Sequence, residues 1–202
     1  WLKKERTAAG LFTEIPSNPL LRTADLSGLD AMLRDREIPL VLDDTVATPV
    51  LVEPFRFADV VTSSLTKAFS GVGDVAAGAV ILRRDGVRCD LLMERLPDAE
   101  AAAPLFARDA IVLERNSRHF EERMRAMDEI AEAVLPVFRE HPKVKTLWHP
   151  SEVCRGFYDQ VRRDEVGYGS LFSIELEGGE AAARGFYDRL RVSKGPSLGT
   201  NF

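Results

Sequence analysis

Residues 58–71 read ADVVTSSLTKAFSG, and this stretch decides the fold and the chemistry expected of the chain. Residues 58–64 are typical of a buried strand that ends in hydroxyl side chains, and a glycine-rich loop follows the stretch. Between strand and loop stands Lys67, preceded at alternate positions by Ser64 and Thr66. Alternate residues of an extended segment share a face, so we expect both hydroxyls to point into one pocket and bind a phosphate. A neutral lysine beside them could form an imine with an aldehyde.

Two stretches nearer the N-terminus also place polar groups just after a strand. Residues 38–42 form a continuous apolar run, typical of a fully buried parallel strand, and Asp43 ends it. A buried carboxylate needs a partner, and the N–H of a pyridinium ring would be one. Residues 10–15 predict another strand, which is followed by Asn18 between two prolines. The Asn18 amide could bond the phenolic oxygen of a pyridoxal ring.

Each of these residues also has an ordinary structural interpretation. Lys67 alone could be a solvated lysine after an edge strand, Asp43 a capping or turn aspartate, and Asn18 a turn asparagine. All three, however, follow the carboxyl ends of predicted strands, and such ends line one rim of a parallel sheet. We therefore predict a binding site for pyridoxal 5'-phosphate (PLP) on this rim, formed by an amide, a carboxylate, two hydroxyls and a lysine.

The order of elements predicts an open α/β sheet. A helix over residues 24–36 lies between the first two strands, and a further strand over residues 77–83 follows the glycine-rich loop. Residues 107–140 have a helical pattern, with an apolar stripe that should face the core. The opposite, polar face carries Glu121, Glu122, Arg123, Arg125 and Glu129.

A second unit is expected after His141-Pro142, which interrupts the helical pattern. Strands over residues 143–148 and 171–176 and a helix that ends near residue 191 belong to it. We therefore predict a PLP-binding portion with its linking helix over residues 1–140. Residues 141–202 are predicted to form part of a C-terminal α/β domain.

Composition narrows the classes of protein and partner. The 202 residues carry a net charge of −5 with both signs interspersed, which argues against nucleic acid and membrane as partners. The two cysteines and three histidines show no metal-binding spacing, so no metal site is expected. Few cysteines and the absence of a signal-peptide pattern favour the cytoplasm.

Five stretches, in order and spacing, resemble the PLP-dependent enzymes of cysteine and methionine metabolism. Three further stretches, LERNSR (113–118), GYGSLFS (167–173) and KGPSLGTNF (194–202), look most like the branch of cystathionine γ-synthases typical of fungi. The resemblance implies the aspartate-aminotransferase-like PLP fold, called fold type I, with an open mixed sheet and helices on both faces. The matching stretches are EIPSNP (14–19), LDDTVATP (42–49), ADVVTSSLTK (58–67), SGVGDVAAG (70–78) and SLG (197–199).

The resemblance assigns a role to each candidate residue. Lys67 would be the catalytic Schiff-base lysine and Asp43 the partner of the pyridine nitrogen. Ser197 would lie beside the substrate carboxylate. The remaining cofactor-binding residues would be Ser64 and Thr66 at the phosphate, Asn18 at the ring hydroxyl, and Thr45 next to the ring.

The implied reaction joins an O-acylhomoserine to cysteine, giving cystathionine. The implied assembly is a homodimer or homotetramer with the active site at the dimer face, acting on small amino-acid substrates. A γ-lyase or an O-acylhomoserine sulfhydrylase of the same family is the first alternative. A catalytically dead PLP-fold module used for assembly or regulation is the second.

Several features depart from the family pattern. Asp44 stands where most members carry asparagine, and Thr200 where many carry a second glycine. Members are roughly twice as long, and their ring-stacking tyrosine and carboxylate-clamping arginine have no counterpart here. We therefore expect these residues to be a fragment, or the ordered part, of a longer chain, and expect them alone to bind PLP poorly and turn over no substrate.

Overall fold

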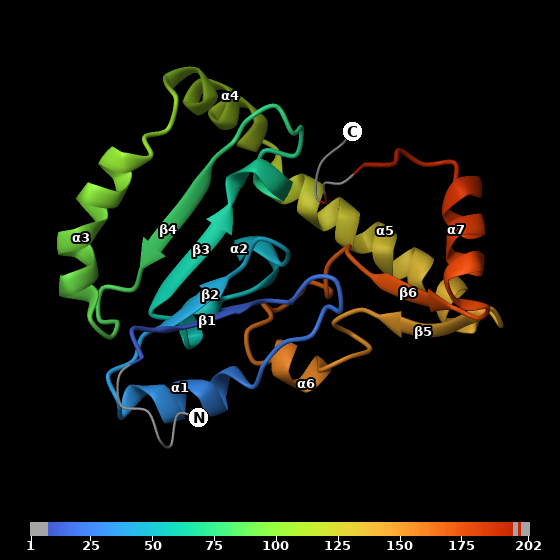
Figure 1. The fold of residues 1–202 in the computed structure, drawn as a ribbon, viewed down its shortest axis with the longest axis horizontal. Coiled ribbons are helices and arrows are strands. Elements are labelled where there is room, and N and C mark those ends of the chain that lie inside the picture. The colour runs from blue at the N-terminus through green and yellow to red at the C-terminus, as the bar shows by residue number, and fades with distance from the viewer. Residues whose placement is uncertain (1–7, 196–197, 199–202) are drawn as a thin grey trace.

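The computed structural model describes residues 8–195 and residue 198. Its main sheet has four strands, which lie side by side in the order β1-β2-β3-β4 (Figure 1). The first three are parallel and the fourth is antiparallel to β3, so the predicted mixed sheet is confirmed. The strands are β1 (Leu11–Glu14), β2 (Leu40–Asp43), β3 (Val60–Ser64) and β4 (Gly78–Leu82).

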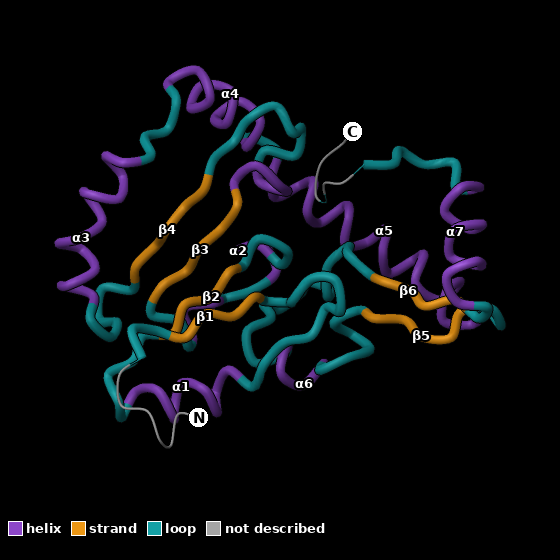
Figure 2. The backbone as a smooth tube through the Cα atoms, in the orientation of Figure 1, coloured by secondary structure: helices purple, strands orange, loops and turns teal. Residues whose placement is uncertain are grey.

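Helices and a small second sheet complete the described part (Figure 2). The helical pattern predicted over residues 107–140 is confirmed, and it forms two helices, α4 (Ala107–Ser117) and α5 (Phe120–Glu140). Helix α3 was not predicted, and Pro97 inside it is a residue usually taken as a helix break. The elements are α1 (Leu26–Arg34), α2 (Thr48–Leu51), η1 (Pro54–Arg56), η2 (Leu65–Phe69), α3 (Cys89–Ala102), α4 (Ala107–Ser117), α5 (Phe120–Glu140), β5 (Val144–Trp148), α6 (Arg155–Tyr158), β6 (Ser173–Leu176) and α7 (Gly179–Arg189).

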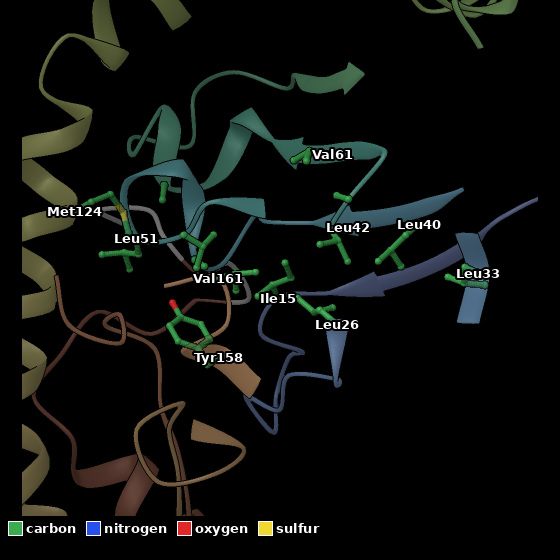
Figure 3. Close-up of a cluster of buried hydrophobic side chains, with 14 of the residues drawn as sticks. Ile15, Leu26, Leu33, Leu40, Leu42, Leu51, Val61, Met124, Tyr158 and Val161 are labelled. Atoms are coloured by element: carbon green, nitrogen blue, oxygen red, sulfur yellow. The ribbon is translucent and has the colours of Figure 1, made fainter. Parts of the chain in front are cut away.

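The core forms where α1 covers the sheet (Figure 3). Leu40 and Leu42 of β2 are fully buried, as expected for a central parallel strand. The apolar face of α1 buries Leu26 and Leu33 in the same cluster. Each fully buried leucine of this kind contributes about 1.5–3 kcal/mol of hydrophobic stabilisation, so this cluster fixes the strands that carry the predicted site.

Segments that follow α5 also contribute to this core. Tyr158 and Val161, from α6 and just beyond it, are fully buried in the cluster. Asp128 of α5 accepts hydrogen bonds from the backbone N–H groups of Gly167 (2.7 Å) and Gly169 (2.8 Å). Strands β5 and β6 form a separate antiparallel sheet. The division of the chain at residue 140 stays a prediction, although α5 does end at Glu140.

Asp25 caps the N-terminus of α1. Asp25 Oδ1 accepts a hydrogen bond from Gly28 N at 3.1 Å and another from Gln160 Nε2 at 3.2 Å. We expect Asp25→Ala to lower the free energy of unfolding by about 1 kcal/mol, the usual cost of losing a capping side chain. Urea-induced unfolding measures the loss. Asp35→Ala, at the opposite end of α1, is the control and should cause no loss, because an acidic side chain there opposes the helix dipole.

Across residues 8–195 and 198, every helix is too short or too polar to cross a bilayer.

Candidate active site

Four residues predicted from the sequence line one cavity at the carboxyl ends of β1 and β2. Asn18, Asp43, Thr45 and Lys67 surround a space of about 260 Å³. Asn18 follows β1, Asp43 ends β2, and Lys67 follows β3, so the shared rim of a parallel sheet brings them together. The other lining residues are Glu14, Pro16, Val46 and Leu198.

The Asp43 carboxylate is held in place by its neighbours. Its Oδ1 accepts a hydrogen bond from Thr45 N at 2.9 Å, and its Oδ2 accepts one from Thr62 Oγ1 at 3.2 Å. Thr45 Oγ1 in turn accepts a bond from Ser64 N at 2.8 Å. These bonds join the ends of β2 and β3, and they fix the direction in which the carboxylate faces the cavity.

Sequence reasoning missed Glu14 as a lining residue. Glu14 is the last residue of β1 and the register partner of Asp43 on β2. Its Oε2 accepts a hydrogen bond from Asn18 N at 3.1 Å, which orients the start of the loop that carries Asn18. The rule that predicted Asp43, a polar residue ending a parallel strand, would also have found Glu14.

The geometry expected for Ser64 and Thr66 is wrong. Strand β3 ends at Ser64, and Thr66 lies in the wide helical turn η2 rather than in an extended segment. Thr66 Oγ1 accepts a hydrogen bond from Ala77 N at 3.0 Å, so it ties η2 to the start of β4. Alternation along a strand therefore does not place the two hydroxyls on one face, and their role at a phosphate stays a prediction.

Lys67 interrupts the helical turn. Its backbone dihedrals, φ −79° and ψ −128°, are not helical, although residues on both sides belong to η2. Its carbonyl oxygen accepts a hydrogen bond from Gly71 N at 2.8 Å. This hydrogen bond closes the turn that follows Lys67. The Lys67 side chain lines the cavity.

Ser197, the residue predicted to bind the substrate, lies outside the described residues. Its neighbour Leu198 lines the cavity that contains Lys67 and also an adjoining cavity of about 320 Å³. Met124 and Met127 of α5 line the adjoining cavity as well. A space with apolar walls therefore lies next to the polar one.

Asp44 is buried beside this site. Its side chain is 3% exposed, and among the described residues its Oδ1 has no hydrogen-bond partner. Burial raises the pKa of Asp44 to about 6, a rise that a hydrogen bond from the Ser63 side chain opposes and the neighbouring Asp43 charge increases.

Comparison with known proteins decides the family. The family model described as "Cys/Met metabolism PLP-dependent enzyme" matches residues 2–201. The chain belongs to this family. It is 39% identical over 193 residues to a cystathionine gamma-synthase of Neurospora crassa, covering 95% of this chain and 31% of that protein. It is 31% identical to an L-methionine gamma-lyase of Fusobacterium nucleatum, covering 94% of this chain and 48% of that protein.

Solved structures agree on the fold. A cystathionine gamma synthase of Xanthomonas oryzae pv. oryzae, in complex with aminoacrylate and cysteine, superposes with a TM-score of 0.84 at 32% identity. The match covers 95% of this chain and 49% of that one. The chain therefore has the fold-type-I architecture of PLP-dependent enzymes, and it spans about a third of the Neurospora protein and half of the Xanthomonas chain.

The groups at the cavity fit the cofactor of this family. A pyridoxal ring offers an aldehyde, a phenolic oxygen and a ring nitrogen, and the cavity offers an amine, an amide and a carboxylate. The Asp43 carboxylate is held by two donors and still borders the cavity, as a partner for a ring N–H must. Among the side chains that the structure describes, His, Cys, Asp and Glu form no group of three or more that could hold a metal ion.

Proposed function

We propose that this chain carries the cofactor-binding part of a PLP-dependent enzyme that makes cystathionine from an O-acylhomoserine and cysteine. One observation carries the proposal: Lys67 and Asp43, 24 positions apart in the chain, border the same cavity with Asn18 and Thr45. Lys67 Nζ is the amine that holds the cofactor covalently. Asp43 keeps the ring nitrogen protonated, and Asn18 contacts the ring hydroxyl.

The remaining roles extend this arrangement. Thr45 borders the ring, Ser64 and Thr66 bind the phosphate, and Ser197 binds the substrate carboxylate. When bound, the cofactor draws electrons from the substrate's carbon atoms towards its protonated ring. Once the amino group of the substrate had replaced it on the cofactor, the freed Lys67 Nζ would accept the proton from the substrate Cα and return protons to the carbon chain, as a general base and acid. Asp43 supports both steps because its fixed negative charge holds the proton on the ring nitrogen.

The proposal extends to the setting of the enzyme. We place the protein in the cytoplasm as a homodimer or homotetramer, with small amino acids as substrates. Residues 1–140 would form most of the cofactor-binding domain and residues 141–202 part of the C-terminal domain. Groups from longer segments and from a second subunit would complete the substrate site.

The likeness to a methionine gamma-lyase keeps a second reaction under consideration. A γ-lyase or sulfhydrylase would use Lys67 and Asp43 in the same early steps. The full-length protein, supplied with PLP, O-acylhomoserine and cysteine, should form cystathionine, measured by mass spectrometry. Release of α-keto acid and ammonia from cystathionine or methionine would instead identify a lyase. Failure of borohydride to attach PLP to Lys67 would favour the catalytically dead module.

A further inference from the structure

The side chain of Arg123 lies against the segment that directly follows Lys67. Its Nη2 is within hydrogen-bonding distance of three consecutive backbone carbonyl oxygens: Ala68 (3.2 Å), Phe69 (2.9 Å) and Ser70 (3.3 Å). Its Nη1 donates to Asn116 O at 3.0 Å. One guanidinium on α5 thus joins the turn of the proposed cofactor lysine to the end of α4.

The buried side chain of Asn116 holds the far end of the same segment. Asn116 of α4 donates from Nδ2 to Ser70 Oγ at 2.9 Å and to Asp74 Oδ1 at 2.8 Å. Ser70 is fully buried, so this bond replaces the water that its hydroxyl would otherwise bind. Asn116 and Arg123, which are themselves hydrogen-bonded, therefore both hold this segment.

Gly71 allows this close approach. A Cβ atom on Gly71 would lie 2.8 Å from Arg123 Nε, closer than non-bonded atoms tolerate. The residue also has φ +76°, a conformation that glycine adopts without strain. Any larger side chain at position 71 would therefore displace the guanidinium or the turn.

The contacts require an arginine rather than any cation. Arginine presents five N–H donors in a rigid planar fork, whereas the lysine ammonium is a compact point charge. The nearby Arg125 shows the contrast: it is half exposed, and it pairs with Glu121 on the surface of the same helix at 3.0 Å. Arg123 is turned towards backbone carbonyls that are 53–55 positions away in the chain.

We infer that Arg123 is a positioning residue that fixes the turn carrying Lys67, and so holds the Lys67 amine in the cavity. The link is short: Arg123 bonds the carbonyls of residues 68–70, and Gly71 N bonds the Lys67 carbonyl at 2.8 Å. The inference rests on the proposed role of Lys67 as the residue that holds PLP. It adds that the affinity of Lys67 for PLP depends on a side chain that does not line the cavity.

The first test compares Arg123→Met and Arg123→Lys with Arg125→Met in the full-length protein. PLP is titrated in, borohydride traps it, and peptide mass spectrometry measures labelling at Lys67. Loss of charge-assisted bonds should raise the PLP concentration for half-labelling by roughly ten- to hundredfold in Arg123→Met. The PLP concentration for half-labelling of Arg123→Lys should lie between those of Arg123→Met and the wild type. That of Arg125→Met should equal the wild-type value.

Hydrogen exchange supplies a readout that needs no cofactor. The amides of Ser70 and Gly71 are bonded to Leu65 O and Lys67 O, and both should exchange faster in Arg123→Met without PLP. Circular dichroism establishes that each variant compared is folded. A folded Arg123→Met with wild-type labelling and wild-type exchange at these amides would overturn the inference.

Gly71→Ala tests the same contact with Arg123 intact. It should weaken PLP labelling at Lys67 as Arg123→Met does, because its Cβ would displace the guanidinium. Gly179→Ala is the control for backbone strain, since Gly179 has φ +60° and nothing within 4 Å of the added Cβ. Equal labelling in both glycine variants would overturn the inference. If the wild type itself is not labelled at Lys67, the proposed function fails, and exchange at residues 70–71 still decides whether Arg123 holds the turn.

Discussion

Lys67→Ala should abolish covalent attachment of PLP and remove nearly all turnover from the full-length protein. The amine is the group expected to bond the cofactor and to move protons at the substrate Cα. Loss of a general base alone lowers rates by roughly 10²–10⁴-fold, and loss of the covalent bond adds to this. Borohydride reduction followed by peptide mass spectrometry measures attachment, and cystathionine formation measures turnover.

Lys145→Ala is the matched control for this experiment. Lys145 lies on β5, is half exposed, and forms an ion pair with Glu175 at 2.7 Å. An isolated surface pair of this kind contributes at most about 1 kcal/mol to stability, so attachment and turnover should stay at wild-type levels. If Lys67→Ala kept trapped PLP on another lysine and kept its turnover, the assignment of Lys67 would be wrong.

The sheet rim was predictable from the sequence because one local rule governs it. A buried apolar run followed by a polar residue marks the carboxyl end of a parallel strand. This rule predicts that Asn18, Asp43 and Lys67 lie on one rim of the sheet, and all three line one cavity. The rule fails where the chain leaves the strand. The helical turn η2 starts directly at Leu65, so Thr66 could not be placed by alternation.

The contacts of Arg123 were beyond sequence reasoning for a different reason. Its position on the polar face of an amphipathic helix predicts a solvated arginine, as Arg125 is. Its acceptors are backbone carbonyls, which every residue has and which leave no mark in the sequence. Such a contact becomes visible only when α5 is docked against η2.

Asp44→Asn should remove a pH dependence from the stability of the protein. Burial raises the pKa of Asp44 from 3.8 to about 6, so its native state favours the protonated carboxyl. The stabilisation due to this proton is complete below pH 3.8 and is lost as the pH rises through about 6. Asparagine has a similar shape and stays neutral throughout. The variant should therefore gain about 2 kcal/mol relative to the wild type between pH 4 and pH 7.5.

Urea-induced unfolding at those two pH values measures the change, and Asp35→Asn, an exposed aspartate at the end of α1, controls for the loss of one carboxylate. The expected gain reflects the cost of a charge in a site where Oδ1 finds no partner among the described residues. Asp44 also adjoins Asp43, so its ionisation adds a second negative charge beside the proposed partner of the cofactor's ring nitrogen. If the Asp44→Asn and wild-type stabilities ran parallel from pH 4 to pH 7.5, Asp44 would have to be ionised already at pH 4. The burial argument would then be wrong, because an ionised carboxylate at 3% exposure requires hydrogen-bond donors that reach both of its oxygens.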